Sequence, residues 1–69
     1  MTFGEALKML MDERGMKPAE LARASGVGKT TISELMRGRS KEPTFSKAKR
    51  LADGLGVPLE RFAELVDES

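Results

Sequence analysis

A chain of 69 residues can form one domain with a small core, near the lower size limit for folding without cross-links. The sequence has no cysteine and no histidine, which excludes disulfides, the usual zinc sites and Ser-His or Cys-His catalytic pairs. No apolar run reaches the roughly 18–20 residues that cross a membrane, and no secretory signal is visible. We therefore expect one cytoplasmic domain over residues 1–69, with no membrane contact, metal, cofactor or enzymatic activity.

The net charge of +1 conceals an uneven distribution of charge along the chain. Residues 1–13 carry a net charge of −2 and residues 51–69 a net charge of −4, whereas residues 14–50 carry +7. A basic centre between acidic ends attracts polyanions to one face of a protein. Chance clustering on an ordinary solvated surface gives the same pattern, so charge alone leaves both interpretations open.

Five segments have the apolar spacing and the boundary residues of helices. Thr2 and Glu5 form a capping box before the first helix, and Gly15 fits the left-handed position that ends it. Pro18 suits the first turn of the second helix, and Gly26 follows its end. No segment alternates with a period of two. We therefore expect a compact all-α, five-helix fold, with helices at about residues 3–14, 18–25, 29–37, 44–54 and 58–66.

The fourth expected helix has a regular apolar stripe and one unusual residue. Its expected core positions are Phe45, Ala48, Leu51, Ala52 and Leu55. Gly54 lies within the same helix, where glycine costs about 1 kcal/mol relative to alanine. This glycine indicates either close packing against a neighbouring helix or nothing at all.

The segment from Pro18 to Gly38 has the pattern of two helices that cross steeply through a short turn. Ala22 is small where the helices cross, Gly26 permits positive φ in the turn, and Val27 places an apolar side chain in the core. The apolar anchors of the two helices are Leu21, Ile32 and Leu35. Each residue alone is weak evidence, but their joint match over 21 residues predicts a helix-turn-helix.

The second helix of this motif divides into two halves at about 100° per residue. The inner half holds Thr31, Ile32, Leu35 and Met36. The outer half holds Lys29, Thr30, Ser33, Glu34 and Arg37. A helix that enters the major groove of DNA needs such a polar outer half without large apolar side chains. A solvated face would look the same, but the turn and the charge distribution favour DNA.

The segment Gly26–Thr31 also matches the end of a nucleotide-binding P-loop. The complete P-loop motif needs a glycine five residues before Gly28, where this chain has Arg23. It also needs a preceding strand in a parallel sheet, which a helical segment in a 69-residue chain does not supply. We therefore assign these glycines to the turn and to the helix cap, and reject nucleotide hydrolysis.

Two segments, PAELARASGVGKTTISELMRG and EPTFSKAKRLADGLGVPLERF, resemble the Cro/repressor-type (XRE-like) helix-turn-helix family. The resemblance extends from Phe3 to about Leu65. It implies a lambda-repressor-like domain that binds a double-stranded DNA operator as a homodimer and regulates transcription, most often as a repressor. A protein-interaction module of the same fold, such as an antitoxin, is the alternative. We expect no separate small-molecule ligand domain.

The resemblance also implies roles for individual residues. The residues expected to read bases are Lys29, Thr30, Ser33 and Glu34. Lysine donates to guanine, threonine forms a hydroxyl hydrogen bond or a methyl contact with thymine, and glutamate accepts from cytosine. Glu34 has an alternative role as the ion-pair partner of Arg37, three residues further on. The residues expected to contact phosphates are Lys17, Arg37, Arg39, Lys41 and Thr44.

Two departures from the family pattern concern DNA binding and the core. Pro18 has no N–H for a phosphate, so Lys17, Ala19 or Glu20 must supply that contact or it is lost. Met11 and Met36 stand where many family members have an arginine–glutamate ion pair. Two apolar side chains leave no orphaned charge, so we expect these methionines to touch in the core.

A domain of this size reads few base pairs, so we expect two copies about 34 Å apart on the operator. The candidate dimer surface surrounds the fifth helix and consists of Val57, Pro58, Leu59, Phe62 and Leu65. Leu59 and Phe62 fit core positions better than surface positions. Leu65 lies beside the core stripe, where it is available to a partner.

Overall fold

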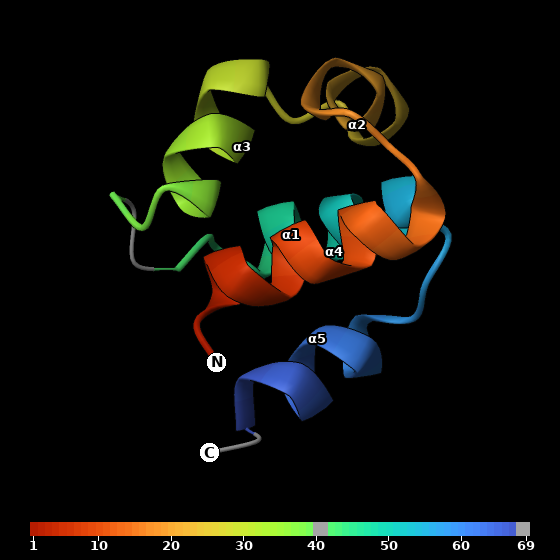
Figure 1. Cartoon of the computed structure of the whole chain (residues 1–69). Helices are drawn as coiled ribbons and strands as arrows, with labels where there is room; N and C mark the ends of the chain where they lie inside the picture. The colour runs from red at the N-terminus through yellow and green to blue at the C-terminus, as the bar shows by residue number, and fades with distance from the viewer. Residues whose placement is uncertain (40–41, 68–69) are drawn as a thin grey trace.

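The computed structural model describes residues 1–39 and 42–67, which form five helices joined by short connections (Figure 1). The helices are α1 (Phe3–Arg14), α2 (Pro18–Ser25), α3 (Lys29–Met36), α4 (Phe45–Leu55) and α5 (Leu59–Asp67). No strand occurs in these two ranges, and the predicted all-α fold is confirmed. None of the five helices is long and apolar enough to cross a membrane.

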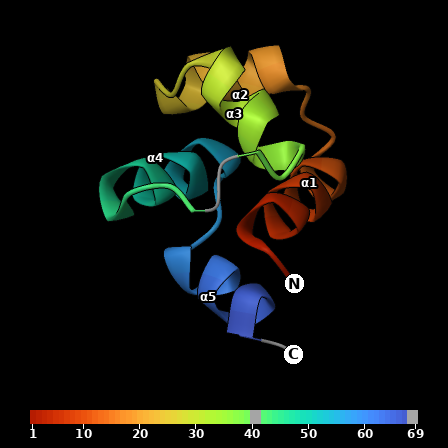
Figure 2. The same cartoon turned by 90° about the vertical axis from the view of Figure 1, so that its left-hand side faces the viewer.

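The helices surround a central pair, α1 and α4 (Figures 1 and 2). In both views α2 and α3 lie above this pair and α5 lies below it. The principal contacts of α2 are with α4, whereas α1 packs against both α3 and α5. The two helices of the predicted motif therefore lie on the opposite side of the molecule from α5.

A single apolar core joins these helices. The buried side chains are Phe3, Ala6, Leu7, Leu10, Met11, Leu21, Val27, Ile32, Leu35, Leu51, Ala52, Leu55, Phe62 and Leu65. No polar or charged side chain is buried in the described part of the chain, so burial of apolar surface is the main stabilising term. The rings of Phe3 and Phe62 stack with their centroids 4.5 Å apart, which holds α5 against the start of α1.

Five helix boundaries differ by one residue from the expected ones, among them the end of α4, which lies at Leu55. The helix α3 ends at Met36, and Arg37 is its C-cap residue. The helix α4 begins at Phe45 because Thr44 is its N-cap, where Oγ1 accepts a hydrogen bond from the Lys47 N–H at 3.3 Å. The helix α5 runs from Leu59 to Asp67, one residue later than expected at both ends.

Phe45 is not a core residue, contrary to the expectation from its spacing. Its side chain is 72% exposed, because it is the first residue of α4 and lies at the end of the apolar stripe. It borders a shallow hollow of about 300 Å³ between α4 and α5. The stripe on α4 meets the core at Leu51, Ala52 and Leu55, while Ala48 is half-buried.

The two methionines of the expected apolar pair differ in burial. Met11 is fully buried in the core, and Met36 is half-buried and packs against the same core. Neither position leaves a charge in the interior. Direct contact between the two side chains stays a prediction.

Two glycines allow helices to approach closely. A Cβ atom on Gly4 of α1 would collide with the Leu35 carbonyl oxygen of α3. A Cβ atom on Gly54 of α4 would lie 2.9 Å from the Ser25 Cβ and 3.0 Å from the Ser25 nitrogen of α2. Gly54 is therefore explained by close packing, the first of the two alternatives left open by the sequence.

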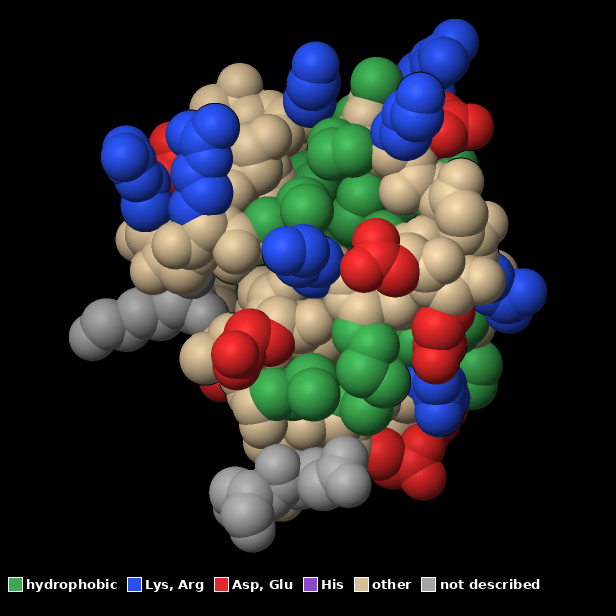
Figure 3. Space-filling view, in the orientation of Figure 1, with side chains coloured by type: hydrophobic (Ala, Val, Ile, Leu, Met, Phe, Trp, Pro, Cys, Tyr) green, Lys and Arg blue, Asp and Glu red, His purple; other side chains and the backbone are tan. Residues whose placement is uncertain are grey.

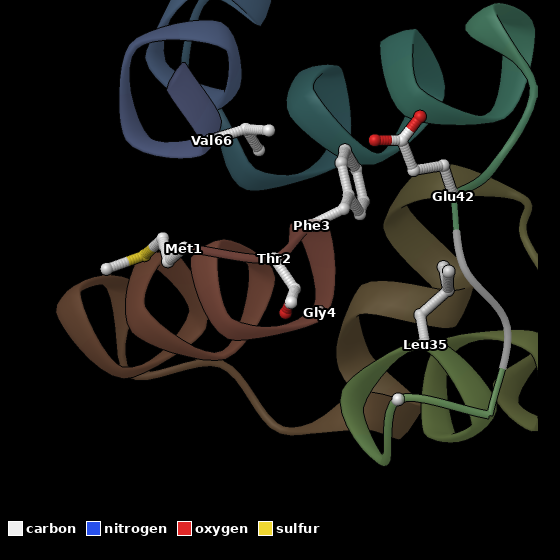
Figure 4. Close-up of a pocket in the computed structure, with 8 residues that line it drawn as sticks. Met1, Thr2, Phe3, Gly4, Leu35, Glu42 and Val66 are labelled. Atoms are coloured by element: carbon white, nitrogen blue, oxygen red, sulfur yellow. The ribbon is translucent and has the colours of Figure 1, made fainter. Parts of the chain in front are cut away.

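A larger hollow, of about 560 Å³, lies beside Gly4 where α1, α3 and the end of α5 come together (Figure 4). In Figure 4, Phe3 and Val66 lie on one side of it and Leu35 on another. Glu42 is the single titratable side chain that lines this hollow within the described residues. The hollow is thus mainly apolar and has no cluster of reactive groups.

The start of α1 is fixed by the predicted capping box. The Glu5 N–H donates to Thr2 Oγ1 at 3.1 Å, and the Thr2 N–H donates to Glu5 Oε1 at 2.8 Å. The hydrogen bond that the Thr2 N–H donates to the carboxylate is the main cause that lowers the pKa of Glu5 below its ordinary value of 4.5. Gly15 ends the helix with a φ of 64°, as its position in the sequence predicts.

Replacement of Gly54 by alanine should destabilise the fold. The added methyl group improves helix propensity by about 1 kcal/mol, but the backbone of Ser25 blocks its position, and overpacking costs about 1–3 kcal/mol. Thermal unfolding should show a lower Tm for Gly54→Ala. The control is Ser46→Ala, at an exposed position of α4, which should leave Tm unchanged or slightly higher. A higher Tm for Gly54→Ala would contradict close packing.

The Glu5 cap should make stability depend on pH in the acid range. Since folding lowers the pKa of Glu5, its contribution is present above pH 4.5 and is lost as the pH falls through the folded-state value. The Glu5→Gln side chain keeps an acceptor oxygen for the Thr2 N–H and does not titrate. Thermal unfolding at about pH 6 and about pH 3 should show a smaller loss of Tm in Glu5→Gln than in the wild type. Equal losses would exclude a role for this carboxylate.

Candidate nucleic-acid interface

The turn between α2 and α3 has the geometry of a helix-turn-helix. Gly26 ends α2 with a φ of 76°, and its N–H donates to the Ala22 carbonyl at 2.9 Å. Val27 is buried in the core, and its N–H donates to Ser25 Oγ at 3.1 Å. Gly28 is extended and acts as the N-cap residue of α3. The turn therefore fixes α3 relative to α2 through local hydrogen bonds and one apolar anchor.

The outer side of α3 brings together the four residues expected to read bases. Ile32 and Leu35 are buried, so the opposite side of the helix faces solvent. Lys29 and Thr30 are exposed at its start, and Ser33 and Glu34 are half-buried one turn later. We call Lys29, Thr30, Ser33, Glu34 and Arg37 the recognition surface.

Glu34 does not form the ion pair that was one of its two expected roles. Both Glu34 and Arg37 are described, and no salt bridge joins them. The backbone carbonyl of Glu34 accepts the Arg39 N–H at 3.0 Å, which holds the chain after α3 against the end of the helix. The half-buried carboxylate is thus available to a ligand.

The expected phosphate contacts lie at helix ends around the recognition surface. Lys17 precedes α2, Arg37 and Arg39 follow α3, and Thr44 precedes α4. All four are exposed. The Thr44 hydroxyl accepts from the Lys47 N–H and still has its own hydrogen to donate. The fifth expected contact, Lys41, lies outside the described residues.

The start of α2 offers few backbone donors to an anion. The Lys17 N–H donates to Glu20 Oε1 at 3.0 Å, and Pro18 has no N–H. The Leu21 N–H donates to the Lys17 carbonyl at 3.0 Å. Of the three residues expected to replace the Pro18 donor, Ala19 and Glu20 keep an N–H without an intrahelical acceptor, whereas the Lys17 N–H is engaged.

Basic side chains are concentrated on the side that carries α2 and α3. In Figure 3, lysine and arginine side chains extend along the upper edge, and acidic side chains are more frequent below. The described ion pair between Arg61 and Glu13, with N and O 3.1 Å apart, joins α5 to α1 on the side away from α3. The uneven charge of the sequence is therefore also uneven in space.

The recognition surface also adjoins a residue that the sequence pattern did not single out. Lys8 of α1 lines a hollow of about 280 Å³ together with Ser33, Met36 and Arg37 of the α3 region. Lys8 belongs to the acidic first segment of the chain, so its charge gave no indication of this position. Only the packing of α1 against α3 brings it there.

The P-loop match is excluded by structure as well as by spacing. The residues before Gly26 form α2 and not a strand, and Gly28 caps α3 with a φ of −60°. The glycines have the roles expected of a turn and a cap.

Two of the residues expected at a dimer interface lie in the core. Phe62 is 2% exposed because it stacks on Phe3, and Leu65 is 7% exposed. Leu65 therefore does not present its side chain to a partner, contrary to expectation. Pro58 is exposed and Val57 and Leu59 are half-buried, so the candidate dimer surface is reduced to these three residues.

A family model described as a helix-turn-helix domain matches residues 2–65. The chain belongs to this family. The helix-turn-helix pattern and the XRE-like resemblance derived from the sequence agree with this assignment.

Two curated proteins share the domain. The chain is 37% identical over 59 residues to the HTH-type transcriptional repressor RghR of Bacillus subtilis (strain 168). These 59 residues cover 86% of this chain and 44% of that protein. It is 38% identical over 56 residues to the HTH-type transcriptional regulator SutR of Escherichia coli (strain K12). These 56 residues cover 81% of this chain and 31% of that protein. The chain thus spans less than half the length of either relative.

Proposed function

We propose that this chain binds double-stranded DNA sequence-specifically and regulates transcription, most simply as a repressor. The observation that carries the proposal is the recognition surface: a polar, solvent-facing side of α3, held by the buried Ile32 and Leu35 within a helix-turn-helix. The two relatives named as a transcriptional repressor and a transcriptional regulator support it.

In this proposal four residues of the recognition surface read base edges from the major groove, and Arg37, the fifth, contacts a phosphate. Lys29 donates to guanine, and Thr30 and Ser33 make hydroxyl hydrogen bonds. Glu34 accepts from a cytosine amino group, since its carboxylate has no cation partner in the described chain. The contacts to phosphates come from Lys17, Arg37, Arg39, Lys41 and Thr44 and fix the register without reading sequence.

A protein-binding role is not favoured. Interfaces between proteins have a core in which charged residues are depleted and aromatic residues and methionine are enriched. The exposed side of α3 carries lysine, hydroxyl groups and a carboxylate, and no large apolar side chain. This composition suits base edges and phosphates better than an apolar partner.

Two further features belong to the proposal. Two copies, joined around Val57, Pro58 and Leu59, would read two half-sites about 34 Å apart. A DNA partner would also place the protein at the nucleoid of a bacterial or phage-infected cell. No second domain for an effector is required for operator binding itself.

Selection of duplexes from a random pool should yield one preferred sequence, whose affinity falls steeply with salt. Lys29→Gln should weaken binding to that sequence by about 1–3 kcal/mol and relax or change the preferred base at one position. Arg39→Gln is the matched variant, with the same loss of charge. It should weaken all duplexes by a similar factor and keep the preferred sequence.

Two results would contradict the proposal. Weak binding of every duplex in the pool, without sequence preference, would exclude a specific regulator. An unchanged preference in Lys29→Gln, combined with a changed preference in Arg39→Gln, would show that the assigned roles are reversed.

Dimer formation is checked by sedimentation at several protein concentrations, with and without the selected duplex. The wild type should shift toward twice the monomer mass as concentration rises, and more completely on DNA. Pro58→Glu should reduce this shift, because it places two negative charges near each other at the two-fold axis. The fold should be kept, since a negative charge is favourable at the start of a helix such as α5. Pro58→Ala is the control for loss of the ring. Equal sedimentation of wild type and Pro58→Glu would exclude this surface.

A further inference from the structure

A small hollow lies where α1 meets the start of α2 and one side of α3. Its volume is about 280 Å³, and its lining residues are Lys8, Pro18, Ser33, Met36 and Arg37. Ser33 and Arg37 also belong to the recognition surface, so the hollow is continuous with it. Three helices that are separate in the sequence therefore form one concave site at the edge of the proposed DNA contact.

The charges around this hollow have one sign. Lys8 and Arg37 are both exposed, and neither forms an ion pair within the described residues. No acidic side chain lines the hollow. Glu5, one turn before Lys8, is held by the Thr2 N–H at 2.8 Å and so is oriented toward the start of α1. Two cations that line one small hollow and have no ion-pair partner attract an anion.

The neutral lining residues complete a site for one phosphate group. Met36 and Pro18 are half-buried and apolar, so the two cations are the charged groups that line this hollow. Arginine offers paired N–H groups that match phosphate oxygens, and lysine adds a compact charge on a flexible chain. The two side chains therefore have complementary roles toward the same group.

The backbone at this place explains why side chains are needed. The start of a helix ordinarily binds phosphate through free N–H groups. In α2 the Lys17 N–H is taken by Glu20, and Pro18 has none. The N–H groups of Ala19 and Glu20 remain, but they carry only partial charge, so any full positive charge beside a phosphate here comes from side chains, and Lys8 and Arg37 are the cations that line the hollow.

We propose that Lys8 and Arg37 together hold one backbone phosphate of the DNA strand that runs along the α1 side of the major groove. This inference rests on the proposed function, because a strand passes the hollow only when α3 lies in the groove. It adds α1 to the DNA-binding elements and assigns Lys8 as a positioning contact that reads no base.

The test compares two substitutions that remove one positive charge each. Lys8→Gln removes the proposed phosphate contact, and Arg61→Gln removes a cation from α5, on the opposite side of the molecule. Arg61 pairs with Glu13 through exposed side chains, so its loss should change stability little. Both variants should unfold at nearly the wild-type temperature, which is measured first.

Binding to the selected duplex is then measured over a range of salt concentrations. Lys8→Gln should lose about threefold to tenfold in affinity at low salt, and the slope of log affinity against log salt should fall by about one per protomer. Its preferred sequence should not change. Arg61→Gln should keep the wild-type slope. Equal slopes in Lys8→Gln and wild type, or an equal loss in both variants, would overturn the inference.

A scan with single neutral methylphosphonates identifies the phosphate. One substitution should weaken the wild type more than it weakens Lys8→Gln, in which only Arg37 still contacts that phosphate. Additive losses at every position would overturn the pairing.

If the wild type binds no duplex specifically, the proposed function and this inference both fail. If it binds normally and Lys8→Gln behaves as Arg61→Gln does, only this inference fails.

Discussion

The contact on which the rest of the molecule depends is the approach of the α1 backbone to the end of α3. Gly4 lies against the Leu35 carbonyl so closely that no side-chain carbon fits between them. This contact sets the height of α3 above α1, while Ile32 and Leu35 set its rotation. The recognition surface and the hollow beside Lys8 both follow from that placement, because each combines α3 with a fixed neighbour.

Much of the fold could be predicted because its boundaries are determined locally. The capping box at Thr2 and the left-handed glycine at Gly26 depend on residues within one turn, and both are present as predicted. Periodicity was also sufficient for the helices themselves. It did not predict the burial of Phe45 and Leu65 correctly. The pattern shows which side of a helix a residue lies on, but not how far the neighbouring helices extend. Phe45 extends beyond them, and Leu65 is covered by them.

The candidate site was predictable where it lies on one helix and not where it joins several. Rotation of a single helix was enough to place Lys29 and Thr30 on the exposed side of α3. Lys8 was missed because its position near Arg37 depends on how α1 packs, and its segment is acidic overall. The cause of Gly54 was open for the same reason, since the close neighbour, Ser25, lies on another helix.

At the start of α2, side chains replace some of the backbone N–H donors, and this should increase the salt dependence of DNA binding. Backbone N–H groups at a helix start are fixed and carry only partial charge, whereas lysine and arginine carry full charge on flexible chains. Pro18 and the engaged Lys17 N–H shift the balance toward side chains at the start of α2. More of the affinity then comes from full charges that displace counterions, so binding should depend strongly on salt. Sequence selectivity, which resides on α3, would be retained as affinity falls, because phosphate contacts weaken all duplexes alike.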